Sequence, residues 1–157
     1  MSPAKSERYL DASVLLPTLI IEPATAAVYE FLGGNNREFL ISDFAAAEVA
    51  SALSRLTRMG RLQASDATAR LADFDAWRAA TTAPAEIHAA DIRLAGAYVR
   101  RFDLALRAPD ALHVAVARRL DAALVTLDRR LAAAARELGV AVEVPTMLEG
   151  LRESPQG

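Results

Sequence analysis

The feature that most constrains the fold is the alternation of short apolar segments with longer segments of helical periodicity. The short segments predict strands at Arg8 to Leu16, Glu38 to Ser42, Glu86 to Ala89, Ala122 to Leu127 and Val140 to Val144. Helices are predicted between them, from Pro23 to the breaker at Gly33, from Ser42 or Asp43 to about Met59, from Ser65-Asp66 to before Pro84, and over Ala90 to Phe102, Ala108 to Leu120 and Arg129 to Leu138. This order is typical of a mostly parallel sheet with helices on both faces, a three-layer α/β/α sandwich. Ligands of such sheets bind beyond the carboxyl ends of the strands, so we expect the functional residues there.

Composition narrows the class of protein. The 157 residues are 53% hydrophobic, enough for a single domain with its own core, which we place at about residues 8–146 with a frayed tail from about residue 152. Because there is no cysteine, thiolate zinc sites, disulfides and a cysteine nucleophile are excluded. No apolar segment is long enough for a secretory signal or a membrane span, and we expect a soluble, cytoplasmic protein. The net charge of -2 argues against binding nucleic acid through a general positive field.

Two acidic residues lie at the ends of predicted strands. Asp11 interrupts the apolar segment YLDASVLL, and Ser13 follows it two residues later. A charge inside a buried strand is costly unless it is paired or bound to a cation. Asp128 follows Thr126 at the end of the segment ALVTLD. Either acid can instead cap a turn or a helix, and for Asp128 that role is compatible with binding a metal.

Two further acids belong to predicted helices. Asp110 follows Pro109 at a helix start, where the helix dipole favours an ionised carboxylate. Glu48 stands alone in the small and apolar segment FAAAEVASALSRL, and it faces either solvent or a cleft.

Taken together, these four carboxylates predict a cation site. If Asp11, Glu48, Asp110 and Asp128 meet at one edge of the sheet, their repulsion has to be relieved by protonation or by a divalent ion. A set of hard oxygen ligands without cysteine suits Mg²⁺ or Mn²⁺. Such ions activate water and bind phosphate oxygens during phosphodiester hydrolysis.

Four segments resemble the PIN-domain family, and more closely the VapC-type toxins of bacterial toxin–antitoxin pairs. They are YLDASVLL, AAAEVASALSRL, APDALHVAVARRL and LVTLDRRLAAAARELGV, which follow one another in the family's order between Tyr9 and Pro145. The resemblance assigns the family's acidic residues to Asp11, Glu48, Asp110 and Asp128, with the hydroxyls of Ser13 and Thr126 in support. It implies a PIN-like sandwich, Mg²⁺- or Mn²⁺-dependent cleavage of RNA, a homodimer and inhibition by a cognate antitoxin.

Basic and aromatic residues add weaker signals. Arginines recur at Arg55, Arg58, Arg61, Arg100, Arg101, Arg107, Arg118, Arg119, Arg129 and Arg130. Each cluster is either a solvated face or part of an RNA groove that a dimer would complete. We expect His113 and His88 to be packed or hydrogen-bonded rather than catalytic, and Trp77 with Phe74 to be core or dimer surface rather than a base-stacking platform.

Three other classes of protein also place acids at the ends of strands. A phosphoacceptor receiver needs an adjacent acid pair and a lysine near the phosphate, but the sole lysine, Lys5, precedes the first strand. A phosphatase with an aspartate nucleophile needs a second acid two residues later, where this chain has Ser13. A non-catalytic metal- or protein-binding module of the same fold would use the acids as caps, and cleavage assays distinguish it from a nuclease.

Overall fold

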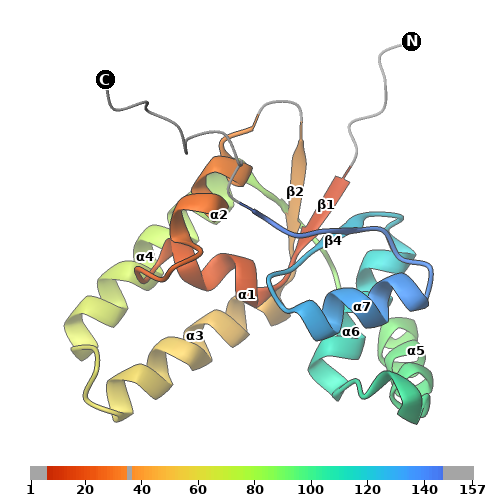
Figure 1. Cartoon of the computed structure of the whole chain (residues 1–157). Coiled ribbons are helices and arrows are strands. Elements are labelled where there is room, and N and C mark those ends of the chain that lie inside the picture. Colours follow the sequence, from red (N-terminus) through yellow and green to blue (C-terminus); the bar gives the residue numbers. More distant parts are fainter. Residues whose placement is uncertain (1–6, 35–36, 147–157) are drawn as a thin grey trace, which may run out of the picture.

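A five-stranded parallel sheet forms the centre of the protein in the computed structural model, which describes residues 7–34 and 37–146 (Figure 1). Its strands are β1 (Glu7–Leu10), β2 (Glu38–Ile41), β3 (Ala83–Pro84), β4 (Ala123–Val125) and β5 (Val142–Glu143). They lie in the order β3-β2-β1-β4-β5, and every neighbouring pair is parallel. The predicted parallel sheet is therefore confirmed, and the predicted tail from residue 152 lies outside the described residues.

Helices cover both faces of this sheet, which confirms the three-layer sandwich. The helices are α1 (Ala12–Leu15), α2 (Thr25–Leu32), α3 (Asp43–Arg58), α4 (Ala64–Thr81), α5 (Ala89–Val99), α6 (Ala108–Arg119) and α7 (Arg129–Glu137), with short 3-10 turns η1 (Leu16–Thr18) and η2 (Phe102–Leu104). Figure 1 shows α1 to α4 on one side of the strands and α5 to α7 on the other. None of the helices in the described part of the chain is long and apolar enough to cross a membrane.

The central strands are buried on both faces, with successive side chains in different cores. Tyr9, Leu40 and Leu124 pack with α5, α6 and α7. Their neighbours Leu10, Ile41 and Val125 pack with the helices of the opposite layer. Because adjacent residues of a strand point to opposite faces, this arrangement produces continuous apolar runs without polar alternation.

The ends of several predicted elements differ from the structure. The predicted strand from Arg8 to Leu16 was wrong beyond Leu10, because Asp11 caps the short helix α1. The strand predicted at Glu86 to Ala89 was also wrong: the edge strand is β3, and the backbone N–H of Ala85 bonds to the Ile41 carbonyl beside it. Pro84 fits there because an edge strand can lack one donor.

A buried ion pair that the sequence did not reveal joins α5 to α6. Asp91 is only 2% exposed, whereas Ile92 beside it is 60% exposed. The Arg119 Nε donates to the Asp91 Oδ1 over 2.8 Å, and the backbone N–H of His88 donates to Oδ2. Burial by itself would raise the pKa of Asp91, but the hydrogen bonds and charge of Arg119 and the His88 amide outweigh it, so this pKa is lowered.

We predict that Arg119→Met lowers the free energy of unfolding by about 3 kcal/mol, because it leaves the Asp91 carboxylate buried without its partner. Urea unfolding at pH 7 measures the change. Arg118→Met is the matched control, since Arg118 is exposed and donates to the Leu138 carbonyl, a neutral acceptor; it should cost under about 1 kcal/mol. Since the folded pKa of Asp91 lies below its ordinary 3.8, the stabilisation is present above that pH and is lost as the pH falls. Equal losses in both variants would contradict this role of the ion pair.

Candidate functional site

Asp11 lies where β1 ends, and its acidic side chain is buried. Its side chain caps α1 by accepting from the backbone N–H of Val14, and the residue is 4% exposed. The hydroxyls of Ser13 and Thr126 each donate to it over 2.6 Å, one to each oxygen. Burial raises the pKa of Asp11, while these hydrogen bonds oppose the rise. The carboxylate is thus held by donors rather than by a basic side chain.

Ser13 and Thr126 join the end of β1 to the end of β4. The Ser13 Oγ accepts from the backbone N–H of Leu127 over 2.9 Å, and the Thr126 Oγ1 accepts from that of Asp128 over 3.0 Å. The two hydroxyls lie 3.2 Å apart, but each has one proton, and Asp11 accepts both. The two supporting residues proposed from the sequence therefore act on Asp11. Ser13 reaches Asp11 across the start of α1 and not along a strand, because β1 ends at Leu10.

Asp128 begins α7 and caps it. Its Oδ1 accepts from the backbone N–H groups of Arg130 and Leu131, at 2.9 and 3.1 Å. The capping alternative raised by the sequence is thus confirmed for Asp128. Within the described residues, no hydrogen bond to its second oxygen is found, so a cap and a cation ligand are compatible here.

Asp110 lies in the first turn of α6, with a half-buried side chain. Burial raises its pKa, the charge of Arg107 opposes this rise, and the negative charge of Asp128 adds to it. The Arg107 Nε lies 3.6 Å from the Asp110 Oδ2. A cation bound here would offset the repulsion between the carboxylates of Asp110 and Asp128.

Glu48 projects from α3 and contacts His113 of α6. The His113 Nε2 lies 2.6 Å from the Glu48 Oε2, and the His113 Nδ1 lies 2.8 Å from the Tyr9 hydroxyl. His113 is 2% exposed, which confirms the predicted packed, hydrogen-bonded histidine. The sequence did not reveal that its partner is Glu48. Burial raises the pKa of Tyr9, so its phenol remains a proton donor.

These acids share one region but do not form a finished metal cage. Asp11 is joined to the end of β4 through the Thr126 hydroxyl, and the negative charge of Asp128 raises the pKa of Asp110. Across residues 7–34 and 37–146, no three acidic or histidine side chains lie close enough to hold a metal ion together. The donor chemistry fits Mg²⁺ or Mn²⁺, since carboxylates dominate and Asp110 is destabilised by a neighbouring negative charge.

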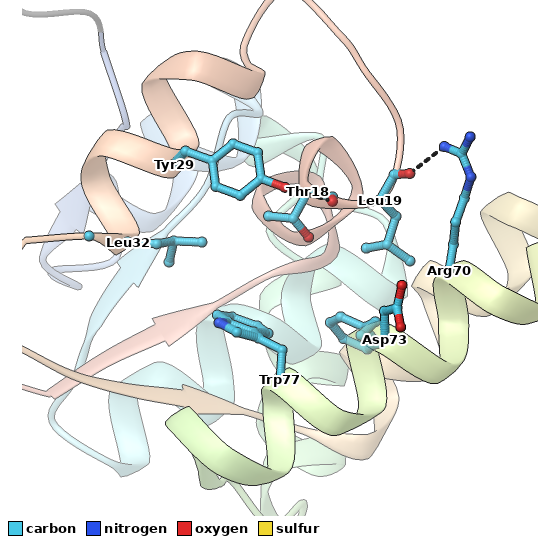
Figure 2. A pocket seen from close by; sticks show the side chains of 9 residues that line it. Thr18, Leu19, Tyr29, Leu32, Arg70, Asp73 and Trp77 are labelled. Atoms are coloured by element: carbon cyan, nitrogen blue, oxygen red, sulfur yellow. Dashed lines mark hydrogen bonds between the residues drawn. The ribbon is translucent and has the colours of Figure 1, made fainter.

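A pocket of about 590 Å³ lies apart from the acids, between η1, α2 and α4 (Figure 2). Its lining includes Tyr29, Arg70 and Trp77, and none of the four acids proposed from the sequence. The Arg70 side chain bonds to the Leu19 carbonyl beside it. Phe74 is buried, with its ring centroid 6.2 Å from that of Trp77. The placement of Phe74 agrees with the core role predicted for this pair.

Most of the recurring arginines are exposed, and some of them also pair within the chain. Arg101 pairs with Asp103 over 2.7 Å, and Arg119 pairs with Asp91. Exposed arginines occur at Arg55, Arg58, Arg61, Arg100, Arg129 and Arg130. The RNA-binding role of any cluster stays a prediction.

The fold and the acidic edge define an α/β domain of the PIN type, and comparison with known proteins agrees. The PIN domain family profile matches residues 8–137. The chain belongs to the PIN domain family. A comparison of the sequence with curated proteins found no significant match.

Several solved structures share this fold. VapBC2 from Rickettsia felis, bound to a promoter DNA fragment, has a TM-score of 0.67 at 15% identity, covering 88% of this chain and 98% of that chain. FitAcB from Neisseria gonorrhoeae has a TM-score of 0.62 at 21% identity, covering 88% and 97%. The Mycobacterium tuberculosis toxin VapC20, which cleaves the sarcin-ricin loop, has a TM-score of 0.65 at 15% identity, covering 81% and 94%. At these identities the likeness shows the fold.

We predict that Thr126→Val lowers the free energy of unfolding by about 3 kcal/mol, because it removes a hydrogen bond to the buried Asp11 charge and leaves the Asp128 amide without its acceptor. Thr126→Ser keeps the hydroxyl and loses one methyl group, so it should cost about 1 kcal/mol. Urea unfolding of both variants at pH 7 measures the difference. If the two substitutions cost the same, the hydroxyl does not support Asp11.

Proposed function

We propose that this protein is a metal-dependent endoribonuclease, the toxin component of a toxin–antitoxin pair. The observation that carries the proposal is the acidic edge, where Asp11 follows β1, Asp110 lies in the first turn of α6 and Asp128 caps α7. Membership of the PIN domain family and the fold shared with VapC20 support it. Carboxylates whose pKa values are shifted by burial and by a neighbouring negative charge cluster at functional sites, and a bound cation would offset their repulsion.

In this proposal Asp11, Asp110 and Asp128 hold Mg²⁺ or Mn²⁺, directly or through water. When bound, the cation activates water and neutralises charge on the scissile phosphate. Ser13 and Thr126 keep Asp11 fixed by donating to both of its oxygens. Glu48 orients the attacking water or assists a second ion, and its half-buried side chain is accessible enough for that role. The reaction requires no protein nucleophile.

The proposed partners follow from the same comparisons. VapBC2 and FitAcB are toxin–antitoxin assemblies, and we expect a cognate antitoxin to inhibit this chain. The exposed arginines are the candidates for phosphate contacts. In a homodimer, the arginines of both subunits would line one groove, and this local positive charge would allow RNA binding although the net charge of the chain is -2. A cytoplasmic location agrees with such a substrate.

We predict that Asp11→Asn lowers the rate of RNA cleavage in Mn²⁺ by at least about 100-fold, because it replaces an anionic ligand and disturbs the donors around it. Cleavage by the wild-type protein should stop in EDTA and return with added Mn²⁺. Asp75→Asn is the control, since Asp75 is exposed on α4. Any co-purifying inhibitor is first removed by denaturation and refolding.

The companion variant Asp110→Asn should abolish toxicity in growing cells while its circular dichroism matches that of the wild type. Equal, EDTA-resistant cleavage by wild type and Asp11→Asn would rule out the proposed site. A folded wild-type protein that binds a partner but cleaves no RNA would instead support the non-catalytic module.

A further inference from the structure

A hydrogen-bonded chain of four side chains runs from the interior to Glu48. The Ser42 Oγ lies 2.8 Å from the Tyr9 hydroxyl, which lies 2.8 Å from the His113 Nδ1. The opposite ring nitrogen of His113 lies 2.6 Å from the Glu48 Oε2. Ser42, Tyr9 and His113 are buried, whereas the side chain of Glu48 is 28% exposed. The chain thus begins in the core and ends at the candidate site.

In each hydrogen bond of this chain, the donor can be the residue nearer Ser42 and the acceptor the residue nearer Glu48. The Ser42 Oγ accepts from the backbone N–H of Ala45, so its own proton is available to Tyr9. Tyr9 can then donate its phenolic proton to the His113 Nδ1. An ionised Glu48 can only accept, so the imidazole donates to it from Nε2. The geometry matches a neutral imidazole that carries its proton on Nε2.

The imidazole has little freedom to move. Its ring centroid lies 5.6 Å from that of Tyr9 and 5.3 Å from that of Phe44. Glu48, by contrast, is a long side chain that samples many rotamers when unrestrained. For the described residues, the contact with His113 is the one hydrogen bond found for the Glu48 carboxylate. A rigid donor therefore fixes a flexible acid before any ligand arrives.

We propose that His113 is a positioning residue for the cleavage reaction, holding Glu48 in its working orientation through a donor chain that starts at Ser42 and Tyr9. This inference rests on the proposed nuclease function. Fixing Glu48 in advance lowers the entropy lost when the reaction geometry forms.

Two substitutions of His113 separate positioning from packing. The asparagine Oδ1 can take the place of Nδ1 and accept from the Tyr9 hydroxyl, but the asparagine side chain is too short to reach Glu48. Glutamine can place its amide near the position of Nε2 and donate to Glu48. We expect His113→Asn to lower kcat in saturating Mn²⁺ by about tenfold, and His113→Gln to stay within about threefold of wild type. His88→Asn is the control, since the His88 side chain is half-exposed and its Nε2 lies near Glu86 and not Glu48.

A double-mutant cycle tests whether the effect passes through Glu48. In the Glu48→Ala background, His113→Asn should cause no further loss of kcat. Thermal unfolding of each variant verifies that it is folded. A wild-type rate in His113→Asn, or the same loss with and without Glu48, would overturn the positioning role. An inactive wild-type protein would overturn the proposed function itself, so the two failures are distinguishable.

A spectroscopic readout requires neither metal nor activity. The chain has two histidines, so ¹H–¹⁵N NMR of the untagged, metal-free protein resolves each imidazole. We expect a slowly exchanging Nε2–H signal from the buried His113, shifted or lost in Glu48→Ala. A proton found on Nδ1 instead, or a signal unchanged in Glu48→Ala, would contradict the donor chain.

Discussion

The buried carboxylate of Asp11 is the interaction on which the site depends. A charge with so little exposure destabilises the fold unless donors surround it, and here two hydroxyls and a backbone amide do so. Because Ser13 follows β1 and Thr126 follows β4, the same bonds hold the ends of two adjacent strands together. The requirement to satisfy one charge thereby fixes where Asp128 begins the next helix.

The architecture was readable from the sequence because apolar runs alternate with helical stretches. Short elements were not readable. Helix α1 has four residues and β3 has two, fewer than either periodicity needs to become visible. The apolar segment from Tyr9 to Leu16 therefore predicted one long strand, although Asp11 ends the strand and caps a helix. Ser13 nevertheless contacts Asp11, across the start of a helix rather than along a strand.

The candidate site was predictable in part. Acids beyond strand ends have a local signature, and Asp11 and Asp128 lie where that signature predicts. Partners that lie far apart in the sequence have none: Glu48 and His113 are 65 residues apart, and Asp91 and Arg119 are 28 apart. Such pairs depend on how helices of different layers meet, which periodicity alone does not encode.

The central claim is that the acidic edge binds one shared cation. Anomalous X-ray diffraction from crystals soaked in Mn²⁺, at concentrations that support RNA cleavage, tests it most directly. The account predicts a peak at the carboxyl edge of β1 and β4, about 2.1 Å from oxygens of at least two of Asp11, Asp110, Asp128 and Glu48, with waters completing the coordination. An active protein whose Mn²⁺ lies elsewhere, or that shows no peak at this edge, would contradict it.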